Sequence, residues 1–192
     1  MICQKIDSSS LCLSRSETAQ RLSVPRDYSS EIFERVKKDI LSVIDCRMAA
    51  VRVPVSVIES EITLGDMRLE SKNLAYALGD SREAFIFAVT LGLGVERALL
   101  RLSRLSVSEH FIADALASAY AEAAADRAQE ILEGYGKTKK RFSPGYGDLP
   151  LFIQPKVLSM LEAEKTLGLT VTDSLLMKPQ KSITAIVGIE NE

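Results

Sequence analysis

The chain has 192 residues, enough for one domain with a sizeable core, and 46% of them are hydrophobic while 26% are charged. A net charge of −2 gives no general attraction to nucleic acid or to an anionic membrane. No apolar run is long enough to span a bilayer, and the first residues lack the apolar core of a signal peptide, so we expect a cytoplasmic protein.

The cysteine and histidine counts exclude several kinds of catalytic site. Cys3, Cys12 and Cys46 have no CxxC spacing and are one short of an iron–sulfur ligand set, so we expect reduced thiols with a structural role. His110 is the only histidine, which excludes zinc sites that need two or more. No G-x-S-x-G motif accompanies it, so most hydrolase and metalloenzyme chemistry is not expected.

The first quarter of the chain is predicted to be helical. Residues 14–17 form a helix-start pattern, and Pro25 ends the helix that follows. Apolar residues then recur at helical spacing over residues 29–47, which predicts an amphipathic helix. We therefore expect residues 1–48 to form a helical segment that packs on the rest of the domain.

Strand patterns follow. Valines alternate with other residues over 49–58, which predicts a half-buried strand whose Pro54 is typical of a sheet edge. Residues 61–67 predict a second strand with a tight turn, and residues 74–79 predict a short helix closed by glycine. The continuous apolar run over 83–90 indicates a central strand buried on both faces.

Gly92 and Gly94 come directly after that strand and form the first candidate ligand loop. A glycine pair in this position can hold a dinucleotide or S-adenosylmethionine (AdoMet). A third glycine is missing, however, and helix follows helix up to residue 133, so no βαβ unit supplies the crevice. A strand-to-helix turn that requires small residues is the favoured interpretation, and a ligand loop is the alternative.

An alanine-rich helix is predicted from residue 106 to about 132, after a shorter helix over 95–105. Asp114, Ser118 and Glu122 lie at positions i, i+4 and i+8 and form one polar line along it. That line is either a solvated face or one wall of a polar cleft.

The stretch 141–150, R-F-S-P-G-Y-G-D-L-P, cannot continue a helix. Arg141 can bind a carboxylate or phosphate through two N–H groups, and Tyr146 has a flat ring with one polar end. The residues alone fit either a surface turn or a ligand-binding loop. The basic residues 137–141 that lead into it are either solvated or face an acidic partner protein.

The last part of the chain is predicted to contain one helix and a hairpin. Gln154 and Pro155 begin a helix that ends near Gly168. Residues 169–177 and 182–189 then read as two strands joined in a hairpin by a four-residue turn.

Two motifs in the C-terminal third resemble a known family. The sequence at 141–150, followed by a helix and then L-T-V-T-D-S-L-L-M-K-P-Q-K-S-I-T at 169–184, is similar to the reactivation (AdoMet-binding) domain of cobalamin-dependent methionine synthase. That family has R-x-x-x-G-Y-P, a helix, and then L-T-E-S-x-A-M-x-P-x-x-S-V-S-G. The resemblance is greatest to its free-standing activation-subunit form. It implies an α+β fold, a mostly antiparallel twisted sheet flanked by helices, in a single domain over residues 1–192.

The resemblance also implies a function that depends on partners. The chain would be an accessory subunit rather than a complete enzyme, presenting AdoMet to a partner's corrinoid so that cob(II)alamin returns to methylcobalamin. The chain lacks the D-x-H-x-x-G cobalamin motif and the cysteines of an electron carrier of its own. Cobalamin would thus come from the cobalamin-binding module of methionine synthase and the electron from flavodoxin or ferredoxin, with neither nucleic acid nor membrane as a partner.

Five residues form the ligand site that the resemblance implies. Arg141 would pair with the methionine carboxylate of AdoMet, and Ser143 would contact the ligand through its backbone. Gly145 and Tyr146 would shape the pocket. Glu122 would replace, from one helical turn away, a ligand-facing glutamate whose place is taken by a serine here. No catalytic residue and no metal ligand are implied, and the family's aspartate near the domain start and its downstream tyrosine have no counterpart.

Two other functions remain open from the sequence. One is a corrinoid-protein interaction module that has lost AdoMet binding. The other is a self-sufficient AdoMet-dependent methyltransferase that uses the Gly92–Gly94 loop, which predicts that binding survives Arg141→Ala but not Gly94→Val.

Overall fold

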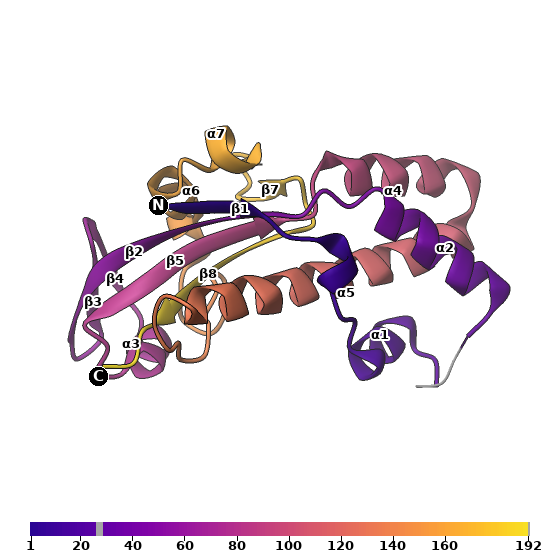
Figure 1. Ribbon diagram of the computed structural model, residues 1–192. Coiled ribbons are helices and arrows are strands. Elements are labelled where there is room, and N and C mark those ends of the chain that lie inside the picture. Colours follow the sequence, from indigo (N-terminus) through magenta and orange to yellow (C-terminus); the bar gives the residue numbers. More distant parts are fainter. Residues whose placement is uncertain (26–28, 192) are drawn as a thin grey trace.

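A computed structural model describes residues 1–25 and 29–191, and an antiparallel sheet lies at its centre (Figure 1). The strands are β1 (Ile2–Lys5), β2 (Arg47–Ile58), β3 (Glu61–Leu64), β4 (Met67–Glu70), β5 (Glu83–Thr90) and β8 (Ser182–Gly188), with β6 (Thr170–Val171) and β7 (Met177–Lys178) as a separate pair. The helices are α1 (Arg15–Leu22), α2 (Glu31–Ser42), α3 (Lys72–Leu78), α4 (Leu93–Leu105), α5 (Val107–Glu133), α6 (Gln154–Met160) and α7 (Ala163–Leu167), with 3-10 turns η1 (Ser8–Ser10) and η2 (Leu151–Ile153). The strand order is β4–β3–β2–β5–β8, with β1 also paired to β2, so the expected α+β fold is confirmed.

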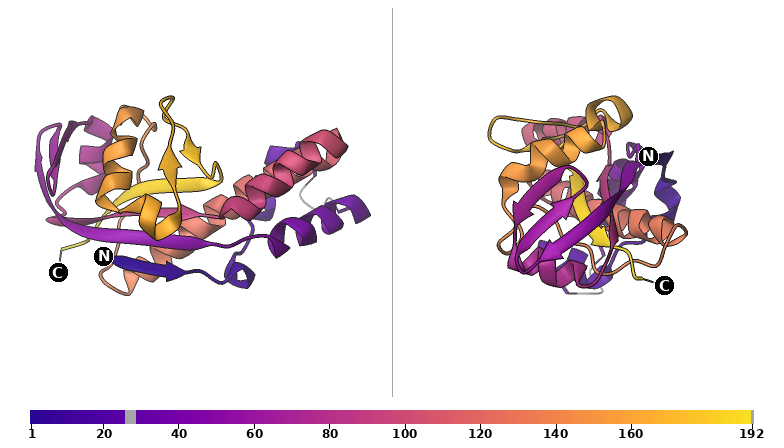
Figure 2. Two further views of the ribbon diagram at one scale, coloured as in Figure 1. Left: turned by 90° about the horizontal axis from the view of Figure 1, so that it is seen from above. Right: turned by 90° about the vertical axis from the view of Figure 1, so that its left-hand side faces the viewer.

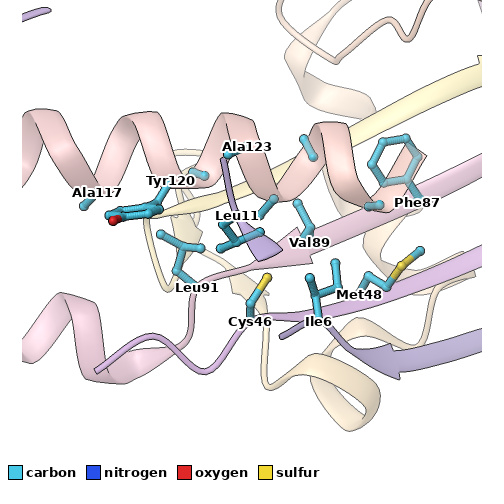
Figure 3. Close-up of a cluster of buried hydrophobic side chains, with 14 of the residues drawn as sticks. Ile6, Leu11, Cys46, Met48, Phe87, Val89, Leu91, Ala117, Tyr120 and Ala123 are labelled. Carbon is cyan, nitrogen blue, oxygen red and sulfur yellow. The ribbon is translucent and has the colours of Figure 1, made fainter. Parts of the chain in front are cut away.

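Helices cover both faces of the sheet (Figure 2). Along β5, Phe85 and Phe87 belong to a core beneath α2, α4 and α5, whereas Ile86 belongs to a second core beneath α3, α6 and α7. This alternation is the period of a strand that is buried on both sides, as the continuous apolar run predicted. The small alanines of α5 bring its backbone close to the sheet, and Tyr120 fills the space between α5 and Leu91 (Figure 3).

The N-terminal segment is less helical than expected. Residues 2–5 form β1, which pairs with the first residues of β2, a strand that the sequence analysis missed. The helix predicted over residues 29–47 ends at Ser42, because Asp45 N–H donates to Leu91 O and the chain has joined the sheet by Arg47. The helical pattern of the sequence extends past Ser42 because Val43 and Ile44 are also apolar, so the pattern alone overestimated the length of the helix.

Pro54, which was expected at a sheet edge, lies in an interior strand. β2 pairs with β5 along one side, and along the other side it pairs with β1 only up to Ala50 and with β3 only from Val55. Pro54 falls in the interval between those two partners, where a missing N–H costs no ladder hydrogen bond. The tight turn at Gly65 and the short helix closed by Gly79 are as predicted.

The C-terminal hairpin prediction is wrong. β8 does not pair with residues 169–177 but with β5, in a register that places Thr90 opposite Ser182. β8 is the last strand of the sheet, and nearly all of its residues are buried because helices cover both of its faces. β6 and β7 instead pair with each other. The single helix expected from Gln154 to near Gly168 is also wrong, because Glu162 has a left-handed backbone (φ 45°) that separates α6 from α7.

Candidate ligand-binding site

A cavity of about 880 Å³ lies beside the outer edge of β8. α5, the 140–146 loop, the start of α6, the β6–β7 pair and β8 all contribute to it. Its lining comprises Glu122, Gln129, Lys140, Arg141, Phe142, Ser143, Pro144, Tyr146, Leu151, Gln154, Leu175, Leu176, Met177, Gln180, Lys181, Ser182, Ile183 and Thr184. The two sequence motifs, separated along the chain, therefore face the same space.

The loop that carries Arg141 is attached to the edge of β8. Phe142 and Ile186 exchange two backbone hydrogen bonds of 2.8 Å, and Lys139 N–H donates to Gly188 O at 2.9 Å. Among the described residues, no backbone hydrogen bond extends this ladder to Thr184, which lines the cavity. An unpaired strand edge can offer its N–H and C=O groups to a ligand.

Asp148 fixes the other end of the loop. Its carboxylate accepts hydrogen bonds from Ser71 Oγ at 2.5 Å, Lys72 N at 2.7 Å and Asn73 N at 3.2 Å, at the first turn of α3. The Ser71 hydroxyl, together with these backbone N–H groups, lowers the pKa of Asp148 because all of them favour the ionised carboxylate. The loop is thus held at both ends, by β8 and by α3.

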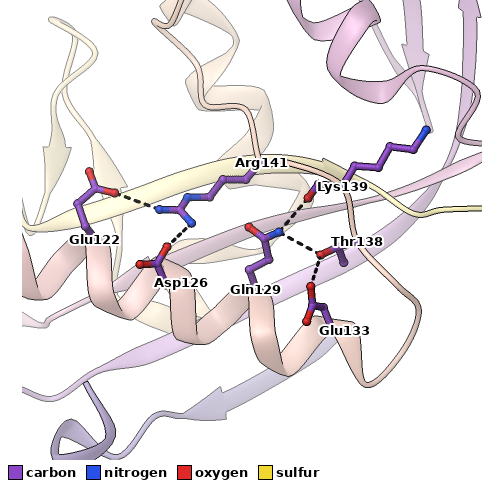
Figure 4. A network of polar contacts seen from close by, with 7 residues as sticks. All are labelled: Glu122, Asp126, Gln129, Glu133, Thr138, Lys139 and Arg141. Carbon is purple, nitrogen blue, oxygen red and sulfur yellow. Dashed lines mark hydrogen bonds and ion pairs between the residues drawn. The ribbon is translucent and has the colours of Figure 1, made fainter. Parts of the chain in front are cut away.

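Arg141 is held between two carboxylates of α5 (Figure 4). Its Nη1 contacts Asp126 Oδ1 at 2.5 Å and its Nη2 contacts Glu122 Oε2 at 3.2 Å. The Arg141 side chain is only 23% exposed, whereas that of Asp126 is 63% exposed. Each carboxylate takes one N–H of the five that a guanidinium carries, so the remaining donors can serve a ligand anion.

Gln129 connects α5 to the segment before Arg141 (Figure 4). Its Nε2 donates to Thr138 Oγ1 at 3.0 Å and to Lys139 O at 2.8 Å, and the Thr138 hydroxyl donates in turn to Glu133. Lys139 Nζ contacts Asp80 at 2.5 Å. These contacts position the backbone from which the Arg141 side chain extends.

The polar line of α5 faces the residues before β8. Lys181 Nζ contacts Ser118 Oγ and Asp114 Oδ1, each at 2.8 Å, and Glu122 one turn further along lines the cavity. Of the two interpretations left open by the sequence, the structure therefore favours the wall of a cleft, although Asp114 itself is half exposed.

The other predicted site residues lie around the entrance. Ser143 and Tyr146 line the cavity, and Tyr146 is 64% exposed. Gly145 is not in the lining, but its φ of 89° is one that side chains rarely adopt, and its N–H donates to Leu149 O at 2.9 Å. Glu122, Arg141, Ser143 and Tyr146 are thus together at the cavity, and Gly145 shapes the turn beside it.

Two cavity residues escaped the sequence analysis. Gln154 is buried, and its Nε2 donates to Thr184 Oγ1 at 2.8 Å and contacts Met177 Sδ at 2.9 Å, which joins α6 to both parts of the second motif. Lys181 occupies a variable position of that motif. No sequence pattern indicates that Gln154 is buried, and the contacts of Lys181 arise only when β8 lies beside α5.

The Gly92–Gly94 loop is not part of this cavity. A Cβ on Gly94 would lie 2.3 Å from Val43 O, and one on Gly92 would lie 3.1 Å from Asp45 O. Both glycines therefore allow close contact with the chain after α2, which is the favoured interpretation from the sequence.

The other histidine, cysteine and acidic residues that the structure describes do not form a metal site. Among the side chains that the structure describes, no cluster of three or more histidine, cysteine or acidic residues could hold a metal ion. All three cysteines are free, and the expected structural role fits buried Cys46 but not Cys3 and Cys12, which are exposed. His110 Nδ1 lies 3.1 Å from Leu99 O, between α4 and α5. No helix in the described part of the chain is long and apolar enough to cross a membrane.

An α+β fold with a curled antiparallel sheet flanked by helices is also the architecture of a solved structure. The crystal structure of the MetH reactivation domain bound to AdoHcy matches 98% of this chain and 78% of that chain, with a TM-score of 0.75 and 17% sequence identity. The chain therefore has the fold of the MetH reactivation domain. No family model matches the sequence, and a search of curated proteins returns no significant match.

Proposed function

We propose that this protein is a free-standing reactivation subunit that holds AdoMet for a corrinoid-carrying partner. The observation that carries the proposal is the convergence of the two family-like motifs on one cavity, which lies in a chain with the fold of a domain solved with AdoHcy. Its volume of about 880 Å³ is in the range of small-molecule sites.

The lining supports a ligand with a nucleoside and an amino-acid part. Arg141 offers N–H donors to a carboxylate, and Glu122 beside it can accept from an ammonium group. The outward edge of β8 near Thr184 and the ring of Tyr146 suit a flat heterocycle with polar edges. AdoMet would supply a methyl group when bound, and this chain's residues would bind and orient it.

In this proposal the chain is an accessory subunit and not a complete enzyme. It acts in the cytoplasm on the cobalamin-binding module of methionine synthase, with flavodoxin or ferredoxin as electron donor. The sequence has neither the D-x-H-x-x-G cobalamin motif nor the cysteines of an iron–sulfur carrier, which supports dependence on partners.

Isothermal titration with AdoMet tests the proposal, with and without a cobalamin-bound methionine synthase that lacks its own reactivation domain. We expect saturable binding in at least one of the two arms, and weaker binding by Arg141→Ala. If wild type and Arg141→Ala both give no heat in either arm, the proposal is wrong.

A corrinoid-protein interaction module without AdoMet binding is the second candidate. It is favoured by one observation, namely that the guanidinium of Arg141 is already paired with Glu122 and Asp126. It predicts capture of the corrinoid protein with an affinity that AdoMet does not change.

A further inference from the structure

Lys181 lines the same cavity, and no family motif assigns it a role. Its side chain is 15% exposed, compared with 52% for its ion-pair partner Asp114. Most lysine side chains that pair with aspartate at a surface are far more solvated than this. The Lys181 ammonium group is therefore largely withdrawn from water beside a ligand-sized space.

The position of Lys181 is fixed by the sheet. Its carbonyl accepts a hydrogen bond from Leu91 N at 3.0 Å, and the next residue, Ser182, has its hydroxyl 2.7 Å from that of Thr90. Because both contacts tie the start of β8 to the end of β5, the lysine is not on a freely moving turn. Such support is what a binding group needs to act at little cost in entropy.

The ammonium group of Lys181 has one N–H donor that can still bind a ligand. Of its three N–H groups, Ser118 Oγ and Asp114 Oδ1 account for two, and the third has no partner among the described residues. Ser118 is four residues before Glu122 on α5, so the cations that contact them, Lys181 and Arg141, are anchored about 6 Å apart along one helix face.

Three cations and one carboxylate line the cavity in the described part of the chain, namely Lys140, Arg141, Lys181 and Glu122. We propose that Lys181 is a specificity-determining residue that binds the carboxylate of the ligand's amino-acid part together with Arg141. This inference rests on the proposed function, but it adds a residue and a selectivity: the cavity binds nucleosides that carry a carboxylate in preference to those that lack one.

Titration of AdoHcy and of methylthioadenosine, which lacks the amino-acid carboxylate, into wild type and Lys181→Met tests the proposal. We expect Lys181→Met to weaken AdoHcy about tenfold, because one charge-assisted hydrogen bond is lost, and to leave methylthioadenosine unchanged. Lys178→Met is the matched control, since Lys178 is an exposed lysine three residues away that does not line the cavity. It should bind both ligands as wild type does.

Each other outcome decides between the two claims. Equal AdoHcy affinity in wild type and Lys181→Met overturns the role of Lys181 and leaves the proposed function standing. Equal weakening of both ligands assigns Lys181 a structural role and also overturns it. If wild type binds neither nucleoside, alone or with its partner, the proposed function fails and the role of Lys181 with it. Lys181→Gln, which can still donate to Ser118, serves if Lys181→Met does not fold and should show the same discrimination.

Discussion

The segments 92–94 and 141–150 each contain two glycines, but the two pairs have different surroundings. Gly92 and Gly94 let the chain after α2 lie against the start of α4, with no space left for a ligand. Gly145, with a φ of 89°, turns the second loop between the cavity residues Pro144 and Tyr146, whereas Gly147, with a φ of 54°, lies against Asn73 of α3. A glycine pair thus indicates backbone geometry, and neighbouring donor side chains identify the binding loop.

The largest expected effect is on folding, at Gly94. Gly94→Ala places a Cβ against Val43 O, a backbone atom that cannot rotate away, so we expect a loss of about 2–3 kcal/mol and a Tm lower by roughly 5–10 °C. Thermal unfolding by calorimetry measures this. Gly134→Ala is the control, since Gly134 has a right-handed helical backbone and should change Tm little. An unchanged Tm for Gly94→Ala would show that the loop is open enough to bind a ligand.

Substitution of Arg141 should affect ligand binding strongly and folding stability only slightly, the opposite of the Gly94 substitution. Arg141→Ala removes charge-assisted hydrogen bonds to the ligand, so we expect AdoHcy affinity to fall about tenfold to a hundredfold by titration. Arg127→Ala is the control, because Arg127 is an ion-paired arginine on α5 that does not line the cavity. This change should leave the affinity for AdoHcy unchanged. Full affinity in Arg141→Ala would move the site away from this loop.

The stability that Asp148 contributes should depend on pH. Since its pKa is lowered from 3.8 in the folded protein, its contacts contribute stability above that value, and this contribution is lost as the pH falls below 3.8 through the lowered pKa. Asp148→Asn leaves only one acceptor oxygen for three donors, so we expect a modest decrease in Tm. Melting both proteins from about pH 5 downwards should show the difference shrinking below 3.8. A difference that persists to the lowest pH would exclude the carboxylate as its cause.

The smallest effect is on thiol reactivity, which reports on the packing near Gly92. Burial, with a contribution from the charge of Asp45, raises the pKa of Cys46 to about 12, so its thiolate is scarce at neutral pH. We expect iodoacetamide to label Cys3 and Cys12 in the folded protein and Cys46 only after unfolding, as judged by mass spectrometry. Gly94→Ala should speed the labelling of Cys46. Rapid labelling of Cys46 in wild type would contradict the close packing described for this region.

The candidate site could be only partly predicted from the sequence. Arg141, Ser143 and Tyr146 were proposed because a family-like motif places them in one short segment, and Glu122 because the resemblance implies a ligand-facing glutamate one helical turn away. Lys181 was missed, since its contacts with α5 join residues 63 positions apart. Gln154 likewise reaches Thr184 over 30 positions.

The sequence by itself determined the elements that depend on local order. β5 follows from an apolar run, α5 from alanine content and helical spacing, and the turn at Gly65 from its residue type. Only the tertiary structure decided which strand β8 joins, because periodicity gives the faces of a strand and not its partner. The pairing of Ser182 with Thr90 brings together residues 92 positions apart, and the cavity exists only beside the edge that this pairing creates.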